Sequence, residues 1–306
     1  MMTDDVIIRY IKTKNKTRKI YTYANDDCIL KSKHIEIADF IEKHCVNSIF
    51  AKAYVVGQSI FENAKAHMYN DFFIMLDIKD FFNSINHNKL VDKLYYELNS
   101  FDDNVINKLE CAEIVELCCV NSVGLPIGFV TSPILSNIYL KDFDGILYGN
   151  LKKMNLDNPI YTRYADDLCI SFKSSDKDLD NKNEIISLVQ KLLKRYSLKL
   201  NEKKSRFYNL KETNHVKVTG VNIVVSNTGN RLLTVGNKIK NDLFWDAINY
   251  YKRDAIDERE MHRIKGMQSF ILSVEKNGYE SCYSDNMMSI VHQLGFTSLK
   301  SLIDSL

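Results

Sequence analysis

The chain has 306 residues, a formal net charge of +2 and a hydrophobic fraction of 45%. This length suits one large domain or about two to three subdomains, and the apolar content excludes a mainly disordered chain. A net charge near zero says nothing about a polyanionic partner, but residues 186–220 hold nine Lys or Arg against two acids. This cluster favours a local surface for a polyanion, although a solvated charged face explains it equally well.

The seven cysteines are odd in number, and no pair has the CxxC spacing of a metal site. Several lie in apolar runs such as 117–120, so we expect reduced cytosolic thiols packed as small apolar groups. Neither a signal peptide nor an apolar run of membrane-spanning length is evident, so no membrane partner is expected.

Residues 6–23 contain two apolar runs that flank a basic turn, which predicts a hairpin. Near its tip lie Lys14, Lys16, Arg18 and Lys19. A cationic hairpin could close over a triphosphate, whereas the alternative is a solvated turn. Further along, a helix is expected over about 30–50.

Ser59 is a suitable cap for a following helix that contains Asn63 and His67. These two residues lie four apart and so share one face of that helix. The continuous apolar run 72–76 then predicts a buried central strand that ends at Asp77. An acid in that position needs a partner or a cation.

Asn86 is expected to cap a helix that runs to residue 98, and a second helix should cover about 103–120. A Gly/Pro loop at 124–133 leads into a helix over about 133–148, with Ser132 as its cap. The free amides at the start of that helix could face a phosphate or a base-paired strand, and a purely structural loop is an equally good interpretation.

Residues 160–172 alternate apolar and polar side chains around a polar turn that contains Asp166 and Asp167. The pattern predicts a β-hairpin with two adjacent carboxylates at its tip. Adjacent acids repel one another, and a hard cation such as Mg²⁺ would remove that penalty. Taken alone, the segment favours an ordinary turn with solvated acids.

The remaining pattern predicts an amphipathic helix at 184–196 and a basic, strand-like segment at 198–206. It then predicts one hairpin built from 216–225 and 231–235. A small all-α subdomain should follow, with helices at 237–252, 257–275 and 285–305.

Asp77, Asp166 and Asp167 would form a three-carboxylate site if a palm-like sheet brings the strand and the hairpin side by side. Two Mg²⁺ ions held there could activate a primer hydroxyl and stabilise the departing pyrophosphate. Either acidic segment alone is a weak signal, but their order, with a Gly/Pro loop and a helix between them, is a stronger one.

In these segments the sequence resembles the reverse transcriptases. The stretch that starts at Asp77 resembles their first catalytic motif, and Tyr164-Ala-Asp-Asp167 resembles their catalytic turn. Leu125 to Asn137 is similar to their template-contacting loop and helix, and Asn201 to Lys204 to the segment whose lysine lies near the pyrophosphate. The resemblance covers about residues 14–275.

The resemblance implies an α+β, right-hand polymerase. Fingers would comprise 1–70 with part of 86–125 inserted, and a palm of antiparallel sheet plus helices would comprise 71–235. An all-α thumb would comprise 236–306.

The resemblance also implies roles for individual residues. Asp77, Asp166 and Asp167 would hold two Mg²⁺ ions, with the carbonyl of Ile78 as a further ligand. Phe82, five residues after Asp77, would clash with a ribose 2′-hydroxyl and so select deoxynucleoside triphosphates, unless it is a core aromatic.

Arg18 would contact the triphosphate, together with Lys16 or one of its basic neighbours, Lys14 and Lys19. Lys204 would donate a proton to the departing pyrophosphate.

A narrower resemblance is to the retron reverse transcriptases, whose NAxxH signature fits Asn63 to His67 and whose VTG signature fits Val218, Thr219 and Gly220. These residues are candidate RNA contacts or shape the fold. The resemblance implies copying of part of a cognate structured noncoding RNA from a guanosine 2′-hydroxyl. The product would be branched, RNA-linked msDNA held with its RNA–DNA hybrid, and the expected setting is antiphage defence with a separate effector protein.

Ile127 departs from the template motif, where many family members have Gln. This departure leaves open an abortive-infection or other defence reverse transcriptase that makes untemplated DNA. A catalytically vestigial RNA-binding scaffold is a third interpretation, against which the three intact acids argue.

Overall fold

The computed structural model describes residues 5–12, 17–101, 105–174, 177–226, 228–253, 257–276 and 278–306. The chain divides into two compact units. The first unit comprises 1–59 and 70–208, and the second comprises 60–69 and 209–306.

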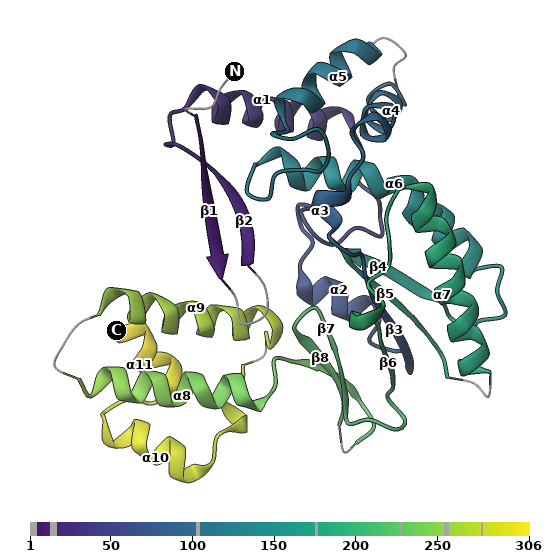
Figure 1. Ribbon diagram of the computed structural model, residues 1–306. Helices are drawn as coiled ribbons and strands as arrows, with labels where there is room; N and C mark the ends of the chain where they lie inside the picture. The colour runs from purple at the N-terminus through teal and green to yellow at the C-terminus, as the bar shows by residue number, and fades with distance from the viewer. Residues whose placement is uncertain are drawn as a thin grey trace. The chain divides into compact units, whose positions relative to one another are not determined.

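A four-stranded sheet forms the centre of the first unit (Figure 1). Its strand order is β4 (Ile160–Tyr164), β5 (Asp167–Phe172), β3 (Phe72–Asp77) and β6 (Arg206–Asn209). Strand β5 runs antiparallel to both β4 and β3. Five of the six β3 residues are buried, which confirms the central strand that the apolar run predicts.

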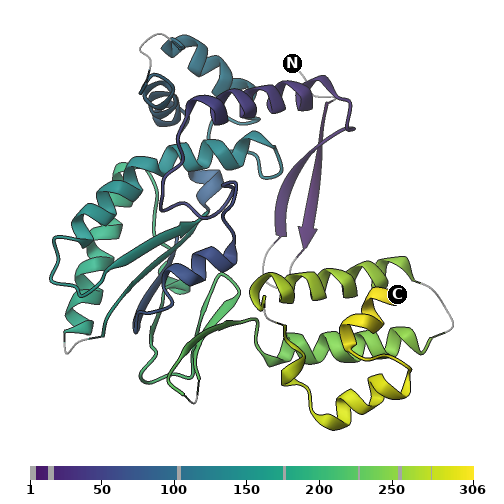
Figure 2. The same ribbon diagram turned by 180° about the vertical axis from the view of Figure 1, so that it is seen from behind.

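Helices of the first unit share one apolar core with this sheet. Helix α6 carries fully buried side chains every four residues, at Leu135, Tyr139, Phe143 and Leu147, and it packs against β4 and α7 (Figure 2). The helices are α1 (Ile29–His44), α3 (Phe81–Ser84), α4 (His87–Leu98), α5 (Lys108–Leu117), α6 (Thr131–Leu151) and α7 (Asp178–Arg195).

Of two predicted helix caps, the one at the start of α4 is present and the one at the start of α6 is not. The side chain of Asn86 caps α4 by accepting a bond from the Lys89 amide at 3.0 Å, as predicted. Ser132 does not cap α6, because the helix already begins at Thr131. The Ser132 hydroxyl instead donates to the Pro126 carbonyl at 2.7 Å and so closes the preceding loop.

The predicted basic hairpin is present as β1 (Val6–Lys12) paired antiparallel with β2 (Thr17–Tyr23). Its tip, with Lys14 and Lys16, lies outside the described residues. The base of β2 joins the Gly/Pro loop, since the Tyr21 amide donates to the Ile127 carbonyl at 2.8 Å.

Gly128 makes this approach possible. A Cβ at Gly128 would lie 2.2 Å from the Tyr21 carbonyl oxygen, and its φ is +113°.

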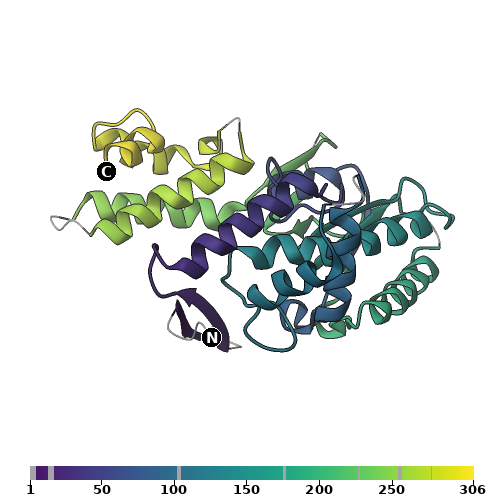
Figure 3. The ribbon, with the colours of Figure 1, turned by 90° about the horizontal axis from the view of Figure 1, so that it is seen from above.

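The second unit combines a three-stranded antiparallel sheet with helices, and α8 and α9 run side by side in it (Figures 1 and 3). Helix α2 packs against all three strands. The elements are α2 (Ile60–Ala66), β7 (His215–Val218), β8 (Val221–Val225), β9 (Arg231–Thr234), α8 (Asn237–Tyr251), α9 (Glu258–Val274), α10 (Asp285–Gln293) and α11 (Leu299–Ser305).

This unit differs from the expectation in three respects. The predicted single hairpin is a three-stranded meander, because Thr219 and Gly220 form an additional turn. The predicted helix 285–305 is two helices, interrupted near Gly295, whose φ is +88°. The boundary expected at 235/236 falls inside this unit, since β9 packs against α9 and all three strands pack against α2.

None of the helices in the described part of the chain has both the length and the apolar character needed to cross a bilayer.

Candidate active site

Asp77 and Asp167 are register partners in the antiparallel pair β3–β5. Asp166 immediately precedes Asp167 in the turn that joins β4 to β5, and its carbonyl accepts a bond from the Ile78 amide at 2.9 Å. Ala165 enters this turn with φ +56°, a conformation that L-residues adopt at a cost. The fold therefore gathers the three predicted acids at one end of the sheet.

Burial and the neighbouring negative charges both contribute to raised pKa values at Asp166 and Asp167. Burial, followed by the charges of Asp166 and Asp77, raises the pKa of Asp167 to about 6. Burial is also the main reason why the pKa of Asp166 is raised. Nearby positive charge, chiefly that of Lys204, acts in the opposite direction on both groups. A cluster with these properties favours a bound cation, because the cation stabilises the charged carboxylates.

Both carboxylate oxygens of Asp77 accept hydrogen bonds. Asn201 Nδ2 donates to Oδ1 at 2.7 Å, and Lys204 Nζ donates to Oδ2 at 2.6 Å. The Asp77 side chain is nearly buried, whereas that of Lys204 is 61% exposed. The bond to Asp77 is the main reason why the pKa of Lys204 is raised.

Backbone pairing brings the segment with Asn201 and Lys204 to Asp77. Ile78 and Leu200 form an antiparallel bridge, and the Asn201 amide donates to the Asp77 carbonyl at 2.7 Å. The short helix Glu202–Lys204 then turns the lysine side chain towards the carboxylates. The side chain of Ile78 is buried in the core, so only its backbone is available to the site.

Within the described residues, no group of three or more His, Cys, Asp or Glu side chains is arranged to hold a metal ion. At Asp77, Lys204 donates to one carboxylate oxygen and Asn201 donates to the other. The donor set itself fits Mg²⁺, since it consists of carboxylate oxygens.

Arg18 lies at the start of β2, close enough for its charge to act on the carboxyl group of Asp166. The charge of this predicted triphosphate contact therefore acts on the acidic cluster. Lys16, the other predicted contact, lies outside the described residues.

Phe82 lies on the short helix α3, directly after the strand that ends at Asp77. Its ring is partly buried against the core, and its carbonyl accepts a bond from the Leu125 amide at 2.7 Å. The neighbouring Gly124 lies so close that a Cβ there would be 2.8 Å from the Cα of Asn83. The Gly/Pro loop therefore holds the helix that carries Phe82.

Asn63 and Thr219, from the two retron-like signatures, are in direct contact within the second unit. Asn63 Nδ2 donates to Thr219 Oγ1 at 3.0 Å, and the Asn63 oxygen is buried without a hydrogen-bond partner in the described structure. Thr219 and Gly220 have φ values of 44° and 97°, the signs that a type I′ turn requires. Asn63 thus supports a turn that threonine disfavours.

The other signature residues are placed differently with respect to solvent. Asn63, His67 and Val218 are buried, whereas Thr219 and Gly220 are half-buried. Only the turn can therefore reach a ligand without a rearrangement of the unit.

Asn201 is the residue of this site to which sequence reasoning gave no role. Its bond to Asp77 spans 124 residues of sequence, and no local pattern predicts such a contact. The one available signal was its place in the basic segment that resembles a family motif.

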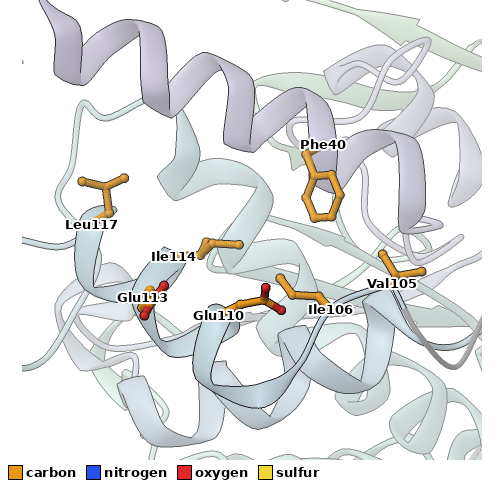
Figure 4. A pocket seen from close by; sticks show the side chains of 7 residues that line it. All are labelled: Phe40, Val105, Ile106, Glu110, Glu113, Ile114 and Leu117. Carbon is orange, nitrogen blue, oxygen red and sulfur yellow. The ribbon is translucent and has the colours of Figure 1, made fainter.

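A separate cavity of about 440 Å³ lies between α1 and α5, and the three aspartates do not line it (Figure 4). Its lining combines apolar side chains with two glutamates, and none of the predicted site residues contributes to it. The lining residues are Phe40, Val105, Ile106, Glu110, Glu113, Ile114 and Leu117.

An antiparallel sheet with an acid at the end of its central strand and two acids in the adjacent turn defines the palm of a nucleic-acid polymerase. Residues 12–223 match the family described as reverse transcriptase (RNA-dependent DNA polymerase), and the chain belongs to that family. Among curated relatives, it is 33% identical over 146 residues to the Retron Ec73 reverse transcriptase of Escherichia coli. This match covers 43% of this chain and 45% of the relative.

It is also 27% identical over 233 residues to the Retron Ec86 reverse transcriptase of E. coli, a match that covers 76% of this chain and 65% of the relative. The chain thus spans about half to two thirds of the length of these two relatives. These matches confirm the resemblance to retron-type reverse transcriptases.

The apo telomerase of Candida tropicalis has a similar fold, with a TM-score of 0.50 at 15% identity. The match covers 73% of this chain and 47% of the telomerase. The α+β, right-hand class expected from the sequence is confirmed.

Proposed function

We propose that the protein is an RNA-directed DNA polymerase whose active site consists of Asp77, Asp166 and Asp167. The register pairing of Asp77 with Asp167, with Asp166 in the adjoining turn, is the observation that carries this proposal. Membership of the reverse transcriptase family supports it, as does the raised pKa of the two turn acids.

The proposed reaction is an in-line displacement at the α-phosphorus of a deoxynucleoside triphosphate. A primer hydroxyl oxygen forms the new bond to phosphorus, and the bond from phosphorus to the β-phosphate oxygen breaks to release pyrophosphate. The three aspartates and the Ile78 carbonyl would hold two Mg²⁺ ions, which supply acidification of the hydroxyl and charge stabilisation of the leaving group.

Lys204 is proposed to protonate the departing pyrophosphate. Its ammonium group lies 2.6 Å from Asp77 Oδ2, so it is already at the acidic cluster. Its exposed side chain is free to move when a cation occupies the carboxylates. The lysine would then exchange one anionic partner, Asp77, for another, the triphosphate.

Arg18 and Lys16 are proposed to bind the triphosphate, and Phe82 to exclude a ribose 2′-hydroxyl. The charge of Arg18 already acts on Asp166, which supports its placement near the reacting phosphates. The fixed position of α3 against the Gly/Pro loop supports a steric role for Phe82, because a gate must resist displacement.

The proposed template is a cognate structured noncoding RNA, copied from a guanosine 2′-hydroxyl into msDNA for antiphage defence in the bacterial cytoplasm. Similarity to bacterial retron enzymes supports this proposal. Asn63, His67 and Val218 would shape the turn at Thr219 and Gly220, which would contact the RNA. A separate effector protein is the expected partner.

Sequencing of the nucleic acid that co-purifies with the protein tests the retron proposal. A single DNA sequence joined to RNA through a 2′-linkage is the expected result. Random or homopolymeric DNA would instead support untemplated synthesis, and RNA without any DNA would support a vestigial scaffold.

A further inference from the structure

Arg163, three residues before Asp166, is fully buried in the palm. Its guanidinium group forms a two-pronged pair with the carboxylate of Asp144 on α6. Nε donates to Oδ1 and Nη2 to Oδ2, both at 2.9 Å. Neither side chain of this pair has any exposure to solvent.

The surrounding groups complete the hydrogen bonding of this pair. Arg163 Nη1 donates to Asn137 Oδ1 at 3.0 Å, and the Tyr161 hydroxyl donates to Asp144 Oδ1 at 2.7 Å. Asn137 in turn donates to the Ala53 carbonyl at 3.0 Å. The cluster therefore joins β4, α6 and the segment before residue 54 by directed bonds.

The backbone of Arg163 is fixed as well. Its amide donates to the Phe50 carbonyl at 2.8 Å, and its carbonyl accepts from the Lys52 amide at 2.7 Å. The side chain of Arg163 is thus bonded to α6, and its backbone is bonded to residues 50 and 52. The next residue, Tyr164, pairs with Asp167, so the constraint reaches the catalytic turn directly.

A buried ion pair is not the most stabilising choice at such a position. Both ions lose their hydration, and apolar residues of similar volume often stabilise a fold equally well or better. The pair instead fixes the local geometry, because the planar fork of arginine sets both the distance and the orientation of a carboxylate. A fixed geometry matters here because the turn with the proposed catalytic acids begins within three residues of Arg163.

We propose that Arg163 is a positioning residue for catalysis. Its bond to Asp144 fixes the β4–β5 turn on α6. Helix α6 begins at Thr131, at the end of the Gly/Pro loop. Asp166 and Asp167 are thereby held at a set position relative to that loop. This inference rests on the proposed catalytic role of the two turn acids.

The test replaces the pair without leaving a charge unpaired, in the variant Arg163→Met, Asp144→Leu and Tyr161→Phe. Primer extension is measured on poly(rA) with annealed oligo(dT), together with thermal melting and Mn²⁺ binding by electron paramagnetic resonance. The expected result is a melting temperature within a few degrees of the parent, a fall in kcat of at least about tenfold with unchanged KM for dTTP, and weaker Mn²⁺ binding.

A folded variant with a parental kcat would overturn the proposal, because the pair would then serve stability alone. If this variant does not fold, the single variant Arg163→Lys tests the proposal instead, since it keeps the positive charge but loses the two-pronged guanidinium group. Measured below its own melting temperature, it should show the same loss of kcat, and a parental kcat would overturn the proposal.

The variant Asp167→Asn is measured in parallel. If it retains synthesis, the proposed active site is wrong. If it is inactive while the Arg163 variants are fully active, only the positioning proposal fails.

Discussion

Asp77 and Asp167 lie directly opposite one another on the paired strands β3 and β5, although 89 residues separate them in the sequence. Asp166 extends this pair into the adjoining turn, and Lys204 reaches it from a short helix beyond α7. Four charged groups from three parts of the sequence therefore meet at one end of the palm sheet.

Replacement of Lys204 by alanine should lower kcat by about a hundredfold or more, because general-acid assistance contributes on that scale. Pre-steady-state nucleotide incorporation measures the effect. The control is Lys203→Ala, since Lys203 lies on the same short helix and only its backbone carbonyl has an assigned role, as an acceptor from Arg206. Equal rates for the two variants would remove Lys204 from the mechanism.

Phe82→Ala should reduce the preference for deoxynucleotides over ribonucleotides by at least about tenfold, since the ring no longer blocks the 2′-hydroxyl. The ratio of kcat/KM for dTTP and UTP measures this preference. Phe81→Leu serves as the control, because Phe81 is buried in the core next to Phe82. If Phe82→Ala leaves the ratio unchanged, the ring is a core aromatic only.

Thr219→Val should lower stability by about 1–3 kcal/mol, because it leaves the buried Asn63 amide without its hydrogen-bond acceptor. It should also weaken binding of the co-purifying RNA, while extension of oligo(dT) on poly(rA) stays unchanged. Thr219→Ser keeps the hydroxyl and should behave like the parent in RNA-binding assays. Parental RNA affinity for the valine variant would exclude the proposed role of this turn.

Folding stability should fall below about pH 6.5 in a manner that depends on His34. Burial lowers the pKa of His34 below its ordinary value of 6.5, and its ring contacts the Tyr23 hydroxyl and the Leu117 carbonyl. Because the unfolded chain then binds a proton that the folded chain excludes, stability is full above this pH and declines on acidification.

Urea unfolding at pH 5 to 7 measures this decline, to which one proton contributes at most about 1.4 kcal/mol per pH unit. His34→Gln should show a shallower dependence than the parent. Identical slopes would show that His34 does not contribute.

The sequence predicted the local elements that form the site, because each has a short-range signature. A continuous apolar run predicted β3, alternation around Asp166 and Asp167 predicted the hairpin, and Asn86 predicted the start of α4. The order of these motifs then predicted the palm, which the family match confirms.

Contacts between distant segments were not predictable from such patterns. The bond from Asn201 to Asp77 and the pair of Arg163 with Asp144 depend on how strands and helices pack, not on neighbouring residues. The turn at Thr219 was missed for a different reason, since a β-branched residue disfavours positive φ and Asn63 supplies the missing support.

The double variant Asp166→Asn and Asp167→Asn tests the polymerase assignment most directly. Its melting temperature should equal or exceed that of the parent, because the raised pKa values of both acids mean that their charges oppose folding at neutral pH. Binding of the poly(rA)–oligo(dT) hybrid should persist, and Mg²⁺-dependent extension should fall by at least about a thousandfold. Extension at the parental rate by the folded variant would contradict the assignment of these acids as the catalytic site.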